Sequence, residues 1–165
     1  MICLLFARGE DWSFGRDGEL PWGHIPRDMG RFSRLTKGNP VYAGRSTFES
    51  IQGGLPDRRV TVFSQKYASV RGCKTMDYEI ALGVMRRMPE QKHMVIGGVE
   101  ALKFFAPHAD RIYMTTVFGT FAHDRHLPHD IIPDGFEAKM LQYWAVSEKN
   151  KHPLVFANFH SKASA

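Results

Sequence analysis

Short apolar runs alternate with helical patterns along the chain, and this alternation restricts the possible folds more than any other feature. The run at residues 2–7 is apolar throughout, as expected for a strand that is buried on both faces. Strands that alternate with helices predict an α/β fold of three layers, with helices on both faces of a mainly parallel central sheet. The predicted strands are residues 2–7, 40–43, 59–63, 94–96 and 111–118, with a further strand near Lys74, and the predicted helices are residues 26–37, 46–51, 77–87 and 99–105.

The C-terminal part of the chain departs from this alternation. Residues 142–147 and 153–159 show partial alternation of apolar and polar side chains, with a short polar segment between them. This pattern predicts an antiparallel hairpin at one edge of the sheet. The 165 residues contain no repeat, low-complexity tract or long linker, which indicates a single domain over residues 1–165.

Composition narrows the class of protein. Hydrophobic residues make up 43% of the chain and charged residues 24%, as in ordinary globular proteins. No run approaches the roughly 20 apolar residues of a membrane-spanning helix, so no membrane association is expected. Arg8 ends the first apolar run and no basic leader precedes it, so we expect no signal peptide. Two cysteines without a disulfide framework indicate reduced thiols and a cytoplasmic location.

The chain is basic, with a formal net charge of +5. Such a charge suits a nucleic acid or an anionic small molecule. The basic residues are scattered, and the sequence contains no zinc-finger spacing and no aromatic-basic RNA motif. A polyanionic small ligand therefore accounts for the charge as well as a nucleic acid does.

Asp28 is the most informative residue for the chemistry of this chain. In a helix over residues 26–37 it shares one face with Phe32 and Leu35, and this face is otherwise apolar. A lone carboxylate in an apolar cleft has a raised pKa and can hold a polar heterocycle. The alternative is an ordinary first-turn carboxylate that complements the helix dipole, since Pro26 suits the first helical position.

Two glycine turns each join a predicted strand to a predicted helix. Gly44-Arg45-Ser46-Thr47 offers close backbone approach, hydroxyl groups and a helix N-terminus that stabilises anions. Val95-Ile96-Gly97-Gly98-Val99-Glu100 has the same layout but is not a G-x-G-x-x-G motif. Each turn alone is also consistent with an ordinary strand-to-helix connection. Together they suggest two phosphate groups on one cofactor.

Two further segments point to a small-molecule site. Residues 15–22 form part of a long loop, over residues 11–24, that is hinged by glycines and carries Leu20 and Trp22, as a lid that excludes water would. Arg58 follows a proline in a turn predicted at residues 53–57 and can clamp a carboxylate. The alternative for residues 15–22 is an exposed irregular loop, and the alternative for the Arg58 segment is a solvated basic turn.

A histidine-rich stretch resembles a metal site only superficially. His123, Asp124, His126, His129 and Asp130 lie in a proline-containing loop, with no predicted helix to fix their spacing. Metal ligands need ordered geometry and supporting hydrogen bonds. We therefore expect no metal site.

Taken together, these residues resemble the dihydrofolate reductase family nearly end to end. The resemblance is carried by the order and spacing of the following elements: Gly15, Leu20-Pro21-Trp22, Asp28, Phe32, residues 44–51, Leu55-Pro56, Arg58, Ile96-Gly97-Gly98 and Tyr113-x-Thr115. It implies NADPH-dependent reduction of 7,8-dihydrofolate to tetrahydrofolate, in support of thymidylate and one-carbon metabolism. It also implies binding of antifolates, and we expect a monomer because no apolar surface stripe demands a partner.

The resemblance also implies a role for each site residue. Asp28 binds the pterin ring with help from Thr115, Arg58 holds the glutamate carboxylate, and the bond between Gly97 and Gly98 is expected to be cis. Leu20, Trp22 and Thr115 join Asp28 as the catalytic set, and the substrate pocket comprises Leu5, Phe6, Ala7, Met29, Phe32, Ile51, Leu55, Arg58 and Ile96. The implied cofactor residues are Ala7, Phe14, Gly15, Asp17, Gly18, Leu20, Gly44, Arg45, Ser46, Thr47, Ser64, Gln65, Lys66, Lys74, Ile96, Gly97, Gly98, Val99, Glu100 and Leu102. Of these, Arg45 and Ser64, with Gln65 or Lys66, would meet the 2′-phosphate.

Some positions differ from the common pattern, and two rival functions remain open at this point. Leu102 stands where a tyrosine often lies, and Glu100 stands where a basic residue often meets the 2′-phosphate. Asp28 is expected to be the only ionisable group in the pocket, so the proton would arrive through water. The rivals are a reductase of the riboflavin pathway and a nucleic-acid-binding protein on a degenerate reductase scaffold.

Overall fold

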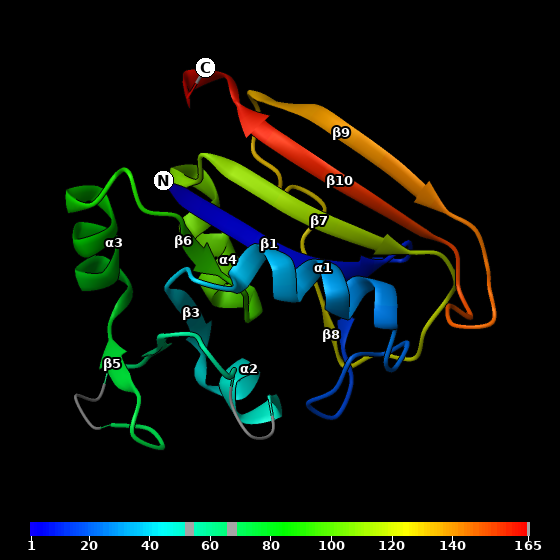
Figure 1. The fold of residues 1–165 in the computed structure, drawn as a ribbon, viewed down its shortest axis with the longest axis horizontal. Coiled ribbons are helices and arrows are strands. Elements are labelled where there is room, and N and C mark those ends of the chain that lie inside the picture. The colour runs from blue at the N-terminus through cyan, green and yellow to red at the C-terminus, as the bar shows by residue number, and fades with distance from the viewer. Residues whose placement is uncertain (52–54, 66–68, 165) are drawn as a thin grey trace.

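A mixed sheet of eight strands forms the centre of the molecule (Figure 1). The strands lie in the order β5-β4-β3-β6-β1-β7-β10-β9. Their bounds are β1 Ile2–Gly9, β3 Val41–Gly44, β4 Val60–Phe63, β5 Lys74–Met76, β6 His93–Val95, β7 Arg111–Val117, β9 Phe136–Trp144 and β10 Leu154–Ser161. This is a computed structural model that describes residues 1–51, 55–65 and 69–164, so Gly53 and Gly54 of the predicted turn lie outside the described residues.

Strand direction divides the sheet into two parts. Strands β5, β4, β3, β6, β1 and β7 run parallel to one another. Strand β10 runs antiparallel to both β7 and β9 at the C-terminal edge. The predicted fold class, mainly parallel with an antiparallel C-terminal hairpin, is confirmed.

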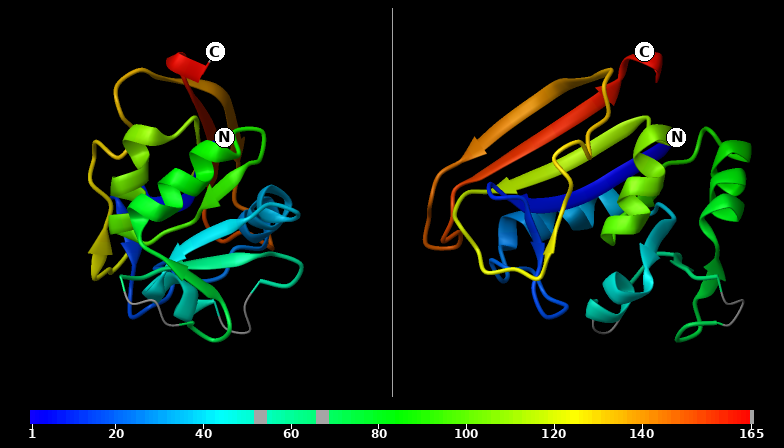
Figure 2. Two further views of the ribbon diagram at one scale, coloured as in Figure 1. Left: turned by 90° about the vertical axis from the view of Figure 1, so that its left-hand side faces the viewer. Right: turned by 180° about the vertical axis from the view of Figure 1, so that it is seen from behind.

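Among the described residues, four α-helices cover the two faces of the sheet: α1 Pro26–Thr36, α2 Arg45–Ser50, α3 Tyr78–Arg87 and α4 Val99–Phe105. Alternate residues of β1 reach opposite faces, as the two-residue period of a strand requires. Leu4 packs with side chains of α3 and α4, whereas Leu5 packs with Phe48 of α2 and Phe32 of α1. Figure 2 shows α1 and the pair α3 and α4 on opposite sides. No helix among the described residues is long and apolar enough to span a membrane.

Two details differ from the sequence prediction. Residues 11–24 are not wholly irregular, because β2 Ser13–Gly15 pairs with β8 Arg125–His126 in a separate small sheet. The first hairpin strand is Phe136–Trp144 rather than residues 142–147. A register shift opposite Asn158 and Phe159 interrupts the alternation of apolar and polar side chains in β9, which removes the pattern that sequence reasoning relies on.

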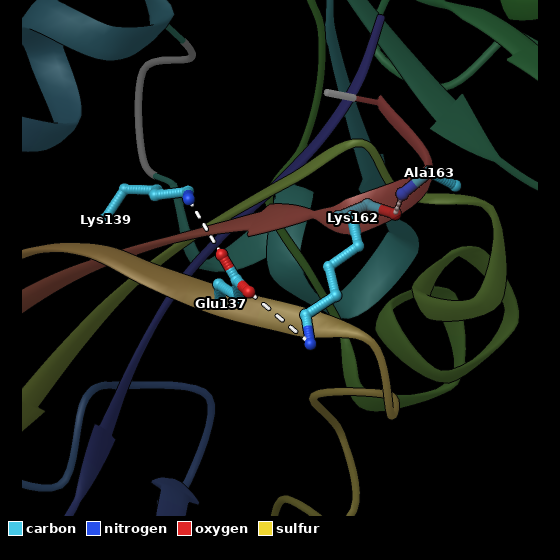
Figure 3. Close-up of polar contacts among 5 residues, drawn as sticks. Glu137, Lys139, Lys162 and Ala163 are labelled. Atoms are coloured by element: carbon cyan, nitrogen blue, oxygen red, sulfur yellow. Dashed lines mark hydrogen bonds and ion pairs between the residues drawn. The ribbon is translucent and has the colours of Figure 1, made fainter.

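Strand β9 forms the exposed edge and carries charged groups there. Glu137 accepts a hydrogen bond from Lys139 Nζ at 2.8 Å, and Lys162 Nζ lies 3.4 Å from its other oxygen (Figure 3). The hydrogen bond from Lys139 is the largest cause of the lowered pKa of Glu137, and Lys162 adds to it. Charged side chains of this kind hinder pairing of an edge strand with another chain.

Gly30 provides a test of helix stability. It lies inside α1, and a Cβ added there would meet no atom within 4 Å. Gly30→Ala should therefore raise the free energy of unfolding by about 0.5–1 kcal/mol, since alanine loses less backbone entropy on folding. Urea denaturation measures the change. Gly38→Ala is the control: Gly38 has φ +76, so this substitution should lower stability. Equal effects of the two would contradict the prediction.

Candidate active site

A cavity of about 700 Å³ opens beside the later part of β1. It lies at the carboxyl ends of parallel strands, because Ser46 follows β3 and Ile96 follows β6. Its lining residues are Leu5, Phe6, Ala7, Phe14, Gly15, Gly18, Glu19, Leu20, Gly23, His24, Asp28, Met29, Phe32, Ser33, Ser46, Thr47, Ser50, Ile51, Leu55, Arg58, Ile96 and Arg125. The structure thus gathers predicted substrate and cofactor residues into one cavity of a size typical for small-molecule sites.

Asp28 is the buried acid of this cavity. Asp28 is only 7% exposed, although it lies in the first turn of α1. A carboxylate that only complements the helix dipole would face water at this position. Burial raises the pKa of Asp28, while a side-chain hydrogen bond with Thr115 and the charge of Arg31 partly lower it. The carboxyl group is therefore placed to hold a polar ring in an apolar setting.

The prediction that Asp28 is the only ionisable group of the pocket is wrong. Glu19, His24, Arg58 and Arg125 also line the cavity, and all but the half-buried Arg58 are exposed. Arg125 lies in β8 and the other three lie in loops, so helical spacing within α1 does not reveal them. Asp28 is still the one ionisable lining residue classed as buried among the described residues.

Sequence reasoning also missed Arg31, which is 5% exposed on α1. It does not line the cavity but donates a hydrogen bond of 3.0 Å to Thr115 Oγ1. Its spacing of three residues from Asp28 is the signal that places both on one helix face. The face predicted to be otherwise apolar therefore contains a buried cation.

The two glycine turns, residues 44–47 and 97–98, lie against each other and together form what we call the glycine cradle. Gly44 N donates to Gly97 O at 2.7 Å, and the peptide bond between Gly97 and Gly98 is cis, which confirms the expectation. A Cβ at Gly44 would lie 3.0 Å from Gly98 N, and one at Gly97 would lie 3.1 Å from Thr47 Oγ1. Only glycine leaves the backbone this accessible beside hydroxyl groups, so the residues present fit a phosphate-bearing cofactor.

The cavity lining does not include Arg45, Ser64 or Gln65, which are predicted to meet the 2′-phosphate, or Lys74, which is predicted as a cofactor residue without a specified contact. Arg45 begins α2 directly after β3, Ser64 follows β4, and Lys74 begins the neighbouring strand β5. Arg45, Gln65 and Lys74 are exposed, so their cationic or polar groups are accessible to a ligand. Lys66 lies outside the described residues.

Other predicted cofactor residues are less well placed. Leu102 is fully buried in a core cluster and presents no side-chain surface to the cavity. Glu100 is exposed and pairs with Lys103 at 3.3 Å. Val99 is half-buried outside the cavity lining, and Asp17 is exposed, with its backbone N–H bonded to Asp124 at 2.8 Å.

Trp22 lies behind the cavity rather than in its lining, and it is 8% exposed. It packs in a core cluster with Ile25, so it anchors the segment that carries Leu20 into the cavity wall. Its indole Nε1 is buried and has no hydrogen-bond partner among the described residues. Such a donor is normally satisfied by a ligand or an ordered water.

Arg58 is held by α1. Its Nε donates to Thr36 Oγ1 at 3.1 Å, and its Nη2 donates to Ser33 O at 3.1 Å and Ser33 Oγ at 2.8 Å. Its Nη1 donates to Pro56 O at 2.7 Å. These bonds fix the guanidinium at the rim of the cavity and leave one Nη1 hydrogen for an incoming carboxylate, with Ser33 Oγ as an exchangeable partner.

Comparison with known proteins decides the family. The family model for dihydrofolate reductase matches residues 1–161. The chain belongs to the dihydrofolate reductase family. It is 32% identical to the dihydrofolate reductase of Bacillus subtilis, over 100% of this chain and 97% of that protein. It is 34% identical to the dihydrofolate reductase of Haemophilus influenzae, over 94% of this chain and 95% of that protein.

A solved structure agrees with this assignment. The dihydrofolate reductase from Enterococcus faecalis, complexed with NADP(H) and RAB-propyl, superposes with a TM-score of 0.87 at 26% identity. The alignment covers 97% of this chain and 95% of that chain. Dihydrofolate reductase is thus the enzyme class of this chain, as its sequence resemblance implied.

The raised pKa of Asp28 predicts how stability responds to pH. A carboxyl whose pKa is higher in the folded state than in the unfolded state binds more protons in the folded state. The free energy of unfolding therefore falls as pH rises from the unfolded-state pKa to the folded-state pKa of Asp28. Asp28→Asn lacks this group. As pH rises through this interval, the free energy of unfolding of Asp28→Asn should therefore increase relative to that of the original protein. The increase should be about 1 kcal/mol or more for each unit by which the folded-state pKa exceeds the unfolded-state pKa.

Urea denaturation from pH 4 to pH 8 measures this difference. Asp134→Asn, at an exposed position, is the control and should show no such trend. A difference between Asp28→Asn and the original protein that is constant or reversed with pH would mean that burial does not raise the pKa of Asp28.

Proposed function

We propose that the cavity lined by Asp28 carries out the reaction of this family, reduction of 7,8-dihydrofolate to tetrahydrofolate by NADPH. The single observation that carries this assignment of residues is a buried carboxyl in a cavity that also reaches the hydroxyl groups of the glycine cradle. A pterin ring beside Asp28 and a nicotinamide beside Ala7 then lie within one cavity.

Asp28 orients the substrate and favours its protonation. NADPH, when bound, supplies the hydride that goes to a ring carbon, and the adjacent ring nitrogen must gain a proton. The Asp28 carboxylate accepts hydrogen bonds from N–H groups of the pterin, which fixes the ring and stabilises positive charge on it. In this proposal the proton comes through water, while Asp28, the buried ionisable residue of the described cavity lining, orients and polarises the ring.

The remaining residues bind and exclude water. Met29, Phe32 and Ile51 provide an apolar wall for the substrate, and Arg58 holds its glutamate carboxylate. Phe14, Gly15 and Leu20 cover the nicotinamide side, which limits access of water during hydride transfer. Antifolates would enter by the same contacts with Asp28.

The glycine cradle and the sheet edge beyond it bind the cofactor. Ser46, Thr47, Gly97 and Gly98 approach the diphosphate through hydroxyl and amide groups. Arg45 and Ser64, with Gln65, meet the 2′-phosphate that distinguishes NADPH from NADH. The predicted monomer and the cytoplasmic location stay predictions.

Neither rival function has a specific observation in its favour. The family match over residues 1–161 assigns the chain to dihydrofolate reductase rather than to a reductase of the riboflavin pathway. The net charge of +5 alone supported nucleic-acid binding, and an anionic cofactor and substrate account for it.

Removal of the carboxylate tests the role of Asp28. Asp28→Asn should lower turnover by about 10²–10⁴-fold, the usual contribution of a group that handles a proton. The assay follows the absorbance of NADPH with dihydrofolate at pH 7, with and without an antifolate. Asp134→Asn, which changes an exposed carboxylate, should keep full activity. Near-normal turnover of Asp28→Asn would remove Asp28 from the mechanism.

Arg45 tests the recognition of the 2′-phosphate. Arg45→Leu should weaken NADPH binding by about 10–100-fold, which corresponds to the loss of one charge-assisted hydrogen bond, and should change NADH binding little. Titration of both cofactors by fluorescence measures this. Arg87→Leu, at an exposed position on α3, controls for the change in net charge. Equal losses of NADPH and NADH affinity would show that Arg45 does not contact the 2′-phosphate.

A further inference from the structure

Arg31 is a buried cation that the roles assigned so far do not use. It lies on α1, is 5% exposed, and is absent from the lining of the cavity. It therefore does not touch a substrate in that cavity. A buried guanidinium is costly unless its donors are satisfied, so its contacts indicate what it does.

The guanidinium joins α1 to strands β7 and β10. Its Nη1 donates to Met114 O at 2.9 Å and to Thr115 Oγ1 at 3.0 Å, both on β7. Its Nη2 donates to Ala157 O at 3.1 Å and to Asn158 Oδ1 at 2.7 Å, both on β10. The group is thus fixed in one orientation by four acceptors on two strands.

These contacts set the direction of one hydroxyl proton. A guanidinium only donates hydrogen bonds, so Thr115 Oγ1 must accept from Arg31. The single proton of Thr115 is then available to another acceptor, and Asp28 is the side chain with which Thr115 is hydrogen-bonded. A carboxylate only accepts, so the sequence of donors runs from Arg31 to Thr115 to Asp28.

We propose that Arg31 is a positioning residue of this reductase, which turns the Thr115 hydroxyl proton toward Asp28 and places a positive charge behind that carboxyl. One oxygen of Asp28 is then held by Thr115, and the carboxyl is fixed in the orientation that a pterin ring needs. The catalytic meaning of this arrangement rests on the proposed function, but the arrangement itself consists of hydrogen bonds within the chain.

The electrostatics of the site agree with this geometry. Burial raises the pKa of Asp28, and Thr115 and Arg31 are the two groups that oppose it. Burial lowers the pKa of Arg31 to about 10, and Asp28 and Tyr113 of β7 oppose that change while Arg34 of α1 adds to it. The other titratable or charged side chains that line the same cavity are Glu19, His24, Arg58 and Arg125.

Direct titration of Asp28 in the ligand-free protein tests the proposal. The Asp28 carboxyl carbon is followed by ¹³C NMR, with its signal assigned by its loss in Asp28→Asn. In Arg31→Met the titration midpoint should rise by about one pH unit, the usual effect of a neighbouring opposite charge. Arg34→Met removes the same charge from an exposed position three residues further along α1 and should shift the midpoint much less.

A double-mutant cycle separates positioning from simple charge. In Thr115→Val the hydroxyl is absent, so Arg31→Met should shift the midpoint by less than half as much as it does with threonine present. Arg31→Lys keeps the charge but cannot form the same set of bonds, and it should titrate closer to Arg31→Met than to the original protein. An equal shift in both backgrounds, or an unchanged midpoint in Arg31→Lys, would overturn the positioning role.

Asn158→Ala keeps the proposal testable if the Arg31 variants do not fold, as judged by circular dichroism. It removes one acceptor of Arg31 and should raise the midpoint by a smaller amount, whereas an unchanged midpoint would overturn the proposal. In the enzymatic assay, the pH above which turnover declines should move upward with the midpoint. If the Asp28 midpoint shifts as expected in these variants but the original protein does not reduce dihydrofolate, the result would contradict the proposed function and leave the positioning role of Arg31 intact.

Discussion

The burial of one carboxylate is the constraint on which the rest of the site depends. Removing a carboxylate from water costs several kcal/mol unless partners compensate it, and Asp28 has only partial compensation. Its pKa is raised by burial and lowered by Thr115 and Arg31. Arg31 is buried too, and it depends on four acceptors that β7 and β10 supply. The chemistry of α1 is therefore supported by the C-terminal half of the chain.

The parallel part of the sheet brings the cofactor and substrate sides together. Strands β3, β6 and β1 are neighbours, so the turns that follow β3 and β6 meet beside the cavity along β1. The hydrogen bond of 2.7 Å between Gly44 N and Gly97 O joins these two turns directly. Weak motifs at distant positions in the sequence thus become one site, because parallel strands place their carboxyl ends at the same edge.

Much of this arrangement was predictable from residue patterns. Buried strands and amphipathic helices gave the α/β class, and the glycine turns and Asp28 indicated a cofactor and an acid in one cleft. The bounds of β9 were not predictable, because its register shift breaks the two-residue period. Arg31 was missed because an arginine on an amphipathic helix is usually solvated. Leu102 is fully buried, which local sequence does not distinguish from a position at the cavity wall.

The sequence by itself determined the fold class, the family and the kinds of groups present, because these follow from periodicity and from motifs that are local in the chain. Only the tertiary structure decided the surroundings of Asp28. Its pKa depends on desolvation and on Thr115, and the orientation of Thr115 depends on Arg31, which is 84 residues away in the chain. Electrostatic free energy depends on distance and burial in space, and neither is encoded in the order of neighbouring residues.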